Sequence, residues 1–274
     1  MDAGFDPRAA SAMFEQMLRA SRYTQRPPEF LLTHPVTQKR ISDTRSRTLS
    51  MAEGDYEDNI VYHLMRARVQ LTQAESPQVA IQRFRDQLRN DTQPSEASQY
   101  GLALAQMKAE QLDRARESLA PLLEHYPEQV HYQLLAANID TQAGEHDAAL
   151  SRLSSLLQDH PQQYSVVMNY GTALMKAELF EQSARVFDRY SRRRREDPEV
   201  WYWLAEVNGL AGNILGVHEA RAEYFIHTGS YNQAIRHLRH AIKEVDQNDP
   251  GHRRIVLRER LKQVEEMQRK RALL

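Results

Sequence analysis

The sequence predicts an all-α solenoid built from repeated pairs of helices, and three observations lead to this prediction. Small or compact residues recur at a spacing of 34 positions, each heading a helix-like run: Ala115, Ala149, Ser183 and Val217. Turn-forming stretches that contain a glycine precede two of them, at residues 143–147 and 211–214. Breaks that contain a proline recur between the units, at Pro127, Pro161 and Pro198.

A period of this length with two helical stretches per unit is typical of a tetratricopeptide-repeat (TPR) array, a right-handed superhelical solenoid. Arrays of this kind hold partners on a surface and do not react with them. We therefore expect a protein that binds other proteins.

Two short helices are expected before the repeats. Asp6-Pro7 is a helix start signal, with proline at the first helical position, and apolar residues follow at helical spacing to about residue 18. Residues 39–47 are expected to begin a second helix. We assign residues 1–49 to a separate segment.

Helical hairpins are expected over residues 50–250, as about five pairs. A divergent first pair covers residues 56–71 and 77–88, and four clearer repeats follow, in which Gly171 and Phe187 are among the packing residues. A new turn-and-helix signal then comes only 17 residues after Val217. The helix at about residues 215–226 is therefore expected to close the fourth repeat and to open a fifth with residues 231–245.

The last segment, residues 251–274, is expected to be a capping helix from about residue 255. It is rich in charge and has few apolar positions: Ile255, Leu257, Leu261, Val264 and Met267. A solenoid needs such an end to cover its final apolar face. The alternative is an arm that forms a coiled-coil dimer.

Composition narrows the functional classes. Charged residues make up 27% and apolar residues 41% of the chain, which is a soluble profile, and no stretch approaches the roughly 18 apolar residues of a membrane span. The net charge of −1 argues against nucleic acid as a partner. The chain has no cysteine, which excludes disulfides and thiolate zinc sites. The first residues do not read as a secretory signal.

The candidate binding surface is the inner face of the array, which the first helix of each pair lines in TPR proteins. The 34-residue period places three sets of residues there: Tyr100, Leu134, Met168 and Tyr202; Leu104, Asn138, Thr172 and Glu206; Lys108, Gln142 and Lys176. TPR arrays that bind the terminal carboxylate of a peptide usually carry lysine and asparagine at the positions of the first two sets, where these side chains pair with the charge. The first set here is aromatic or aliphatic, which favours a groove for apolar or extended segments. The alternative is that some of these residues pack against neighbouring helices.

Other charged and histidine clusters are expected to be structural. The run Arg192–Arg195 is followed by two acidic residues and reads as a solvated helix end. His237 and His240 have no third ligand nearby in sequence and read as surface residues. The string that begins at His218-Glu219 has Ala222 where an HExxH zinc motif needs its second histidine.

Two stretches before the repeats resemble the end of a gluzincin-type zinc metallopeptidase domain: residues 3–7 followed by Met13-Phe14, and residues 30–35 with Arg40-Ile41. Together with the repeats, they resemble the periplasmic β-barrel assembly-enhancing proteases of Gram-negative bacteria. That family binds zinc through an HExxH helix and a later glutamate, and this chain contains neither. His34 matches a loop histidine that lies close to the catalytic cleft in such relatives; the alternative is that it caps the turn.

The resemblance implies that residues 1–49 are a short helical remnant of the C-terminal end of the peptidase domain. It also implies that the rest is the non-catalytic TPR region of a zinc metalloendopeptidase, with no metal or other cofactor in this chain and zinc in the intact parent. The implied partners are unfolded or assembling outer-membrane β-barrel proteins and the barrel-assembly machinery, with neither nucleic acid nor direct membrane insertion. The implied location is the periplasm. The alternative is a stand-alone TPR scaffold with cytoplasmic partners, in which residues 1–47 only cap the array.

Overall fold

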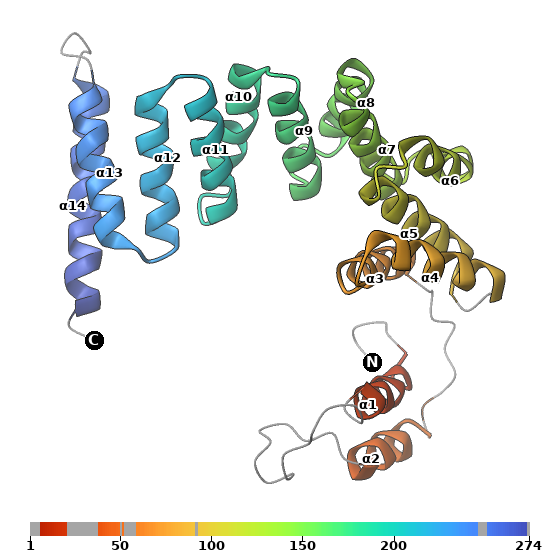
Figure 1. Cartoon of the computed structure of the whole chain (residues 1–274). Coiled ribbons are helices and arrows are strands. Elements are labelled where there is room, and N and C mark those ends of the chain that lie inside the picture. The colour runs from red at the N-terminus through yellow and green to blue at the C-terminus, as the bar shows by residue number, and fades with distance from the viewer. Residues whose placement is uncertain are drawn as a thin grey trace. The chain divides into compact units, whose positions relative to one another are not determined.

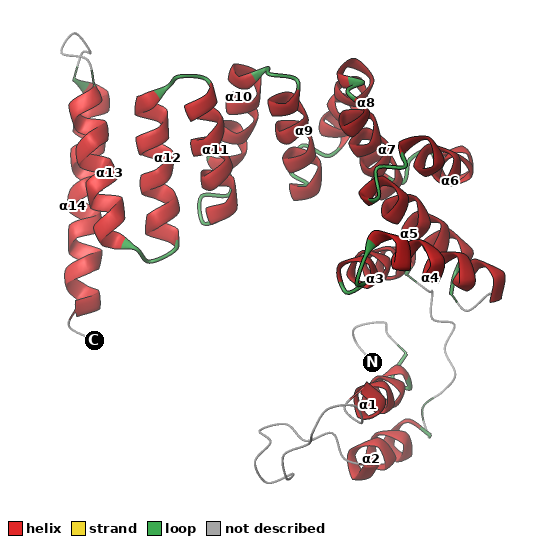
Figure 2. Ribbon diagram, viewed as in Figure 1, coloured by secondary structure: helices red, strands yellow, loops and turns green. Residues whose placement is uncertain are grey.

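The computed structural model of the chain describes residues 6–20, 38–49, 51, 59–90, 93–245 and 251–272. Within these ranges the chain forms fourteen helices and no strand, which confirms the predicted all-α TPR fold (Figures 1 and 2). None of the described helices is both long and apolar enough to cross a lipid bilayer. The chain divides into two compact units, Met1–Ile60 and Val61–Leu274. The boundaries at residues 49 and 250 stay predictions.

The first unit contains α1 (Ala9–Ala20) and α2 (Gln38–Thr48), which pack against each other. Asp6 caps the start of α1, since its carboxylate accepts a hydrogen bond from the backbone N–H of Arg8 at 2.9 Å. The guanidinium of Arg40 on α2 lies 4.9 Å from the ring centre of Phe14 on α1. Both predicted helices are therefore present. Residues 21–37, with His34, lie outside the described residues.

The second unit contains the remaining helices. They are α3 (Ile60–Thr72), α4 (Pro77–Asn90), α5 (Ser95–Lys108), α6 (Leu112–His125), α7 (Val130–Ala143), α8 (His146–Asp159), α9 (Tyr164–Lys176), α10 (Phe180–Ser191), α11 (Pro198–Leu210), α12 (Ile214–His227), α13 (Tyr231–Glu244) and α14 (His252–Ala272). From α4 onward each helix packs against the next, and α7 also contacts α5 and α9. Successive apolar clusters are shared between neighbouring pairs, over α7–α9, α9–α12 and α12–α14. The core therefore runs along the array.

Glycines let aromatic rings pack directly on the backbone at two contacts between consecutive helices. A Cβ atom built on Gly101 of α5 would lie 2.3 Å from the ring of Phe84 on α4. A Cβ atom built on Gly171 of α9 would lie 2.2 Å from the ring of Phe187 on α10. Both rings are fully buried. The predicted packing role of Gly171 and Phe187 is confirmed.

The 34-residue period is also visible in the turn between the two helices of a pair. Left-handed backbone conformations occur at Glu110, Gly144, Glu178 and Gly212, with φ angles of 60°, 80°, 61° and 71°. Each of these residues stands 34 positions after the previous one. One turn geometry is thus repeated four times, although two of the four positions hold a residue with a Cβ atom.

The last helices of the array, α12, α13 and α14, lie where the sequence predicts helices. Helix α12 packs against both α11 and α13, and α14 packs against α13. Leu257 and Val264 of α14 are buried in the cluster shared with α12 and α13, as a cap requires. Ile255, another apolar position of this helix, is 61% exposed. Arg260 of α14 holds the carboxylate of Glu223 on α12 with two nitrogens, at 2.7 and 2.5 Å.

Candidate functional site

Three of the eleven predicted partner-binding residues are buried. Tyr100, Leu104 and Leu134 are 0%, 7% and 1% exposed. The hydroxyl of Tyr100 accepts a hydrogen bond from Arg68 Nε on α3 at 2.7 Å, and its ring lies 5.9 Å from that of Tyr132 on α7. Buried side chains cannot contact a partner on the surface. These three residues therefore pack against neighbouring helices, which is the alternative that the sequence left open.

Four other predicted residues line one hollow on the first helices of successive pairs. The hollow has a volume of about 570 Å³. It is lined by Asn138, Gln142, Thr172 and Lys176, together with Met107, Thr141, Asn169 and Ala173. These residues lie on α5, α7 and α9. We call this hollow the α7–α9 groove.

Several polar groups of the α7–α9 groove are free to bind a ligand. The hydroxyls of Thr141 and Thr172 donate to carbonyls of their own helices, at 2.7 and 2.8 Å. In contrast, the side chains of Asn138, Gln142 and Lys176 make no hydrogen bond or ion pair with the part of the chain that the structure describes. Gln142 and Lys176 are exposed and Asn138 is partly buried, so two amides and one ammonium group can pair with an incoming chain. Polar side chains thus line part of the groove, and no residue of the first set lines it. The expectation of a groove for apolar or extended segments stays a prediction.

Amide side chains suit the recognition of a polypeptide backbone. Each amide offers both a donor and an acceptor, as a peptide group does. Lys176, at the C-terminal end of α9, adds one positive charge that can pair with a carboxylate. The groove can therefore hydrogen-bond an extended segment without demanding one particular side chain.

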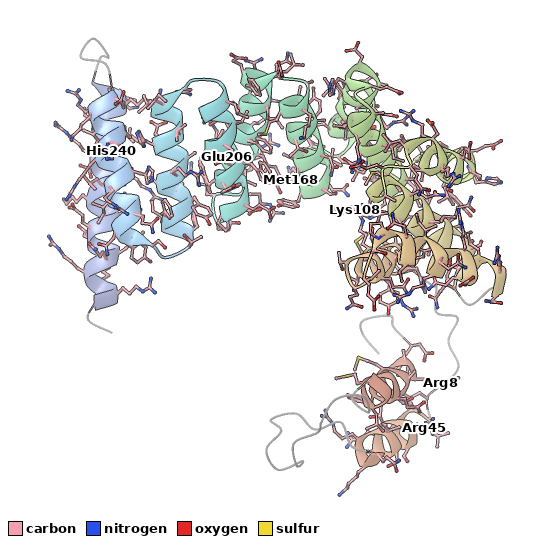
Figure 3. All side chains as sticks on the ribbon, in the orientation of Figure 1. Arg8, Arg45, Lys108, Met168, Glu206 and His240 are labelled. Atoms are coloured by element: carbon pink, nitrogen blue, oxygen red, sulfur yellow. The ribbon has the colours of Figure 1, made fainter. Side chains whose placement is uncertain are left out.

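The remaining predicted residues lie apart from this groove lining. Lys108 is exposed at the end of α5, and Met168 packs against the apolar cluster of α9–α12 (Figure 3). Tyr202 and Glu206 both contact Arg221 of α12: the guanidinium lies 5.1 Å from the Tyr202 ring centre and forms an ion pair with Glu206. This intramolecular cluster occupies the face that the sequence assigned to a partner.

Sequence reasoning missed a histidine pair between α12 and α13. The Nδ1 atoms of His218 and His237 lie 3.1 Å apart, and the ring of His237 stacks on that of Phe225 at 5.4 Å. His237 is partly buried, so the prediction of a surface residue is wrong for it. The two histidines stand 19 positions apart, and only the antiparallel pairing of their helices brings them together. Among the described residues, no group of three or more His, Cys, Asp or Glu is arranged to hold a metal ion.

The arginine run is exposed, as a solvated helix end should be. Arg192 pairs with Asp188 one turn earlier on α10, with 2.9 Å between Nη2 and Oδ2. Arg193, Arg194 and Arg195 follow in the turn after α10, and all three are exposed.

Family models of the tetratricopeptide repeat agree with this architecture. The family model of the tetratricopeptide repeat matches residues 100–164 and 141–207. A solved tetratricopeptide repeat protein from Parabacteroides merdae superposes with a TM-score of 0.46 at 13% identity, over 92% of this chain and 98% of that one.

Two curated relatives match most of this chain over about half of their own length. The β-barrel assembly-enhancing protease of Escherichia coli K12 is 30% identical over 246 residues, which is 89% of this chain and 50% of that protein. The putative β-barrel assembly-enhancing protease of Vibrio cholerae is 29% identical over 89% of this chain and 51% of its own length. The chain thus spans about half the length of these relatives. It is a homologue of the β-barrel assembly-enhancing proteases that carries a tetratricopeptide-repeat array.

Proposed function

We propose that this chain holds protein partners in the α7–α9 groove and does not itself cleave them. The observation that carries the proposal is the groove: three successive first helices form its wall, and Asn138, Gln142 and Lys176 have polar groups without partners among the described residues. Binding through side-chain amides suits an extended chain whose own backbone groups are unpaired.

The proposed partners are unfolded or assembling outer-membrane β-barrel proteins, or the machinery that assembles them, in the periplasm. The homology supports this choice, because the relatives that match 89% of the chain are named for enhancing β-barrel assembly. A β-barrel protein that has not yet closed has strand edges with free N–H and C=O groups. The amide side chains of the groove can form hydrogen bonds with these free groups.

Zinc chemistry is not assigned to residues of this chain. The resemblance implies a zinc site in the parent enzyme, which needs two histidines at i and i+4 and an acidic third ligand. The chain contains no HExxH sequence. The described residues do not fit the ion, and no step of the proposal depends on it.

Photocrosslinking tests the proposal. A photoreactive amino acid at Gln142 on the groove is compared with one at Glu117, which is exposed on α6. We expect crosslinks from position 142 to a urea-unfolded outer-membrane β-barrel protein, few from position 117, and no cleavage of that protein with added zinc. Equal crosslinking from both positions would contradict groove binding, and zinc-dependent cleavage would contradict the non-catalytic role.

A further inference from the structure

A second hollow, with a different lining, lies along α8, α9 and α10. Its volume is about 470 Å³. Arg185, Arg189 and Arg193 line one side, and the buried side chains of Val167 and Leu174 on α9 contribute apolar surface at its base. We call it the arginine groove. It shares no lining residue with the α7–α9 groove.

The three arginines form a row of like charges. They follow each other at intervals of four residues. Arg185 and Arg189 lie on α10, where this interval places side chains on one face about 6 Å apart, and Arg193 follows in the turn after α10. All three are exposed, and none forms an ion pair with a carboxylate of the described residues. The groove lining contains no Asp or Glu. Like charges at this spacing destabilise a helix by tenths of a kcal/mol per pair, so the row is unfavourable for the isolated fold.

The repeat fold does not require arginine at these positions. The residues 34 and 68 positions earlier lie in the same register of the preceding repeats. They are Ser151, Ser155 and Asp159 in one repeat, and Glu117, Pro121 and His125 in the other. Neither repeat carries a row of positive charges there. The arginines therefore belong to this repeat alone and not to the packing rules of the array.

We propose that the arginine groove binds an acidic, amphipathic segment of a partner protein. Guanidinium groups recognise carboxylates with two parallel hydrogen bonds. A spacing of about 6 Å matches carboxylates on every fourth residue of a helix, or on every second residue of an extended strand. The apolar surface beside the row, which includes Leu157 and Val186, takes the apolar side chains of the same segment.

The apolar base favours a protein over a phosphate-rich partner. A nucleic acid or a lipid headgroup would satisfy the arginines but leave Val167, Leu174 and their apolar neighbours uncovered. An amphipathic peptide covers both kinds of surface at once. This inference is independent of the α7–α9 groove, and Gln142→Ala should not affect it.

Peptide display on the full chain tests the inference. Random 12-residue peptides are selected on the immobilised protein, and the affinities of the enriched peptides are then measured at low and high salt. We expect peptides that combine acidic and apolar residues and bind more weakly as salt rises. The double variant R185S/R189S, which carries the serines of the preceding repeat, should weaken their binding about tenfold or more.

A matched control separates the groove from bulk charge. The variant R194S/R195S removes the same charge from the neighbouring turn, and neither of these residues belongs to the groove lining. It should change the affinity by less than about twofold. The inference is overturned if acidic peptides are not enriched, if both variants weaken binding equally, or if phosphatidylglycerol vesicles or single-stranded DNA bind the groove and the peptides do not. If the serine variant melts at a lower temperature, R185Q/R189Q gives the same comparison.

Discussion

The close contacts of Gly101 and Gly171 show how single residues set the spacing of the helix pairs. Each leaves room for an aromatic ring that would otherwise meet a Cβ atom at less than 3 Å. Gly209 on α11 also lies within a helix, but a Cβ atom there would meet only Val217, at 3.8 Å. The chain therefore offers two glycines with the same secondary structure and different surroundings, Gly171 and Gly209.

Gly171→Ala should destabilise the array by about 1–3 kcal/mol, because the buried Phe187 ring must move out of a rotamer that the core supports. Gly209→Ala should be neutral or stabilise by up to about 1 kcal/mol, since alanine is the better helix former. Urea unfolding followed by circular dichroism measures both. Equal destabilisation by the two substitutions would show that packing on Phe187 is not the cause.

The His218–His237 pair makes stability depend on pH at residue scale. Burial is the largest cause that lowers the pKa of His237 to about 4, and the nearby His218, Arg221, His240 and Arg236 add to it. Burial also lowers the pKa of His218, with a further contribution from His240 and an opposing one from Glu244. Both imidazoles are therefore held neutral in the folded state.

The unfolded chain binds protons on these residues at a higher pH than the folded chain does, near the ordinary histidine pKa of about 6.5. The free energy of unfolding therefore has its full value above that pH and decreases as the pH falls toward 4. For His237 we expect a loss on the order of 1–2 kcal/mol, reduced from the full linkage value because the ring is partly exposed. His237→Gln should flatten the dependence of the melting temperature on pH between 7 and 4.5. The exposed His252→Gln should leave the slope unchanged, and an equally steep slope in both variants would refute this account.

At the scale of elements, the backbone conformation of the turn within each pair is the same from repeat to repeat, although the residues that form the turn differ. Glu110 and Glu178 take the left-handed conformation that Gly144 and Gly212 adopt at the same position of the neighbouring repeats. A residue with a Cβ atom costs about 1–2 kcal/mol there, whereas glycine does not. The surrounding helices must therefore impose the turn on these two residues.

Glu110→Gly and Glu178→Gly should each stabilise the array, by about 0.5–1 kcal/mol, after allowance for the greater chain entropy of glycine in the unfolded state. Thermal unfolding measures the effect. Glu117→Gly, within α6, is the control and should destabilise by about 1 kcal/mol. If the two turn substitutions lower the melting temperature as the control does, the backbone is not strained at these positions.

The period of the sequence predicts the elements well but does not predict which side of a helix faces the core. The 34-residue spacing and the turn signals locate the helix pairs, the shared helix α12 and the cap. The sequence predicts Tyr100, Leu104 and Leu134 on the binding face because the 34-residue period places them at equivalent positions on the first helices of the pairs. In the structure the neighbouring helices cover them, as for Tyr100 under Arg68 of the divergent α3. Such contacts between distant segments leave no local pattern.

The same limit applies to the binding sites. Asn138, Gln142, Thr172 and Lys176 follow from the period, because they lie one and two helical turns along the same face of successive first helices. The arginine groove does not follow from it, because its lining comes from three consecutive helices and its basic row departs from the repeat. The sequence nevertheless contains one signal of this groove, because Arg185 and Arg189 stand where the preceding repeat has serines.

At the scale of the whole chain, the residues that match the named relatives span about half of the relatives' length. The two grooves of the chain have different chemistry. The α7–α9 groove presents free amide side chains that can hydrogen-bond a peptide backbone, and the arginine groove presents guanidinium groups beside an apolar surface. A partner that engages both would gain affinity from each without any new contact. The separation of their lining residues allows either groove to be disabled alone.

The affinity for an unfolded outer-membrane β-barrel protein, diluted from urea and measured by biolayer interferometry, tests the central claim most directly. The triple variant N138A/Q142A/K176A removes the free polar groups of the α7–α9 groove, and E117A is the matched surface control. At about 0.5–1.5 kcal/mol per lost contact, the triple variant should bind at least tenfold more weakly and E117A should bind within about twofold of the wild-type chain. Unchanged binding by the triple variant, with its helical content preserved, would contradict the claim that this groove holds the partner.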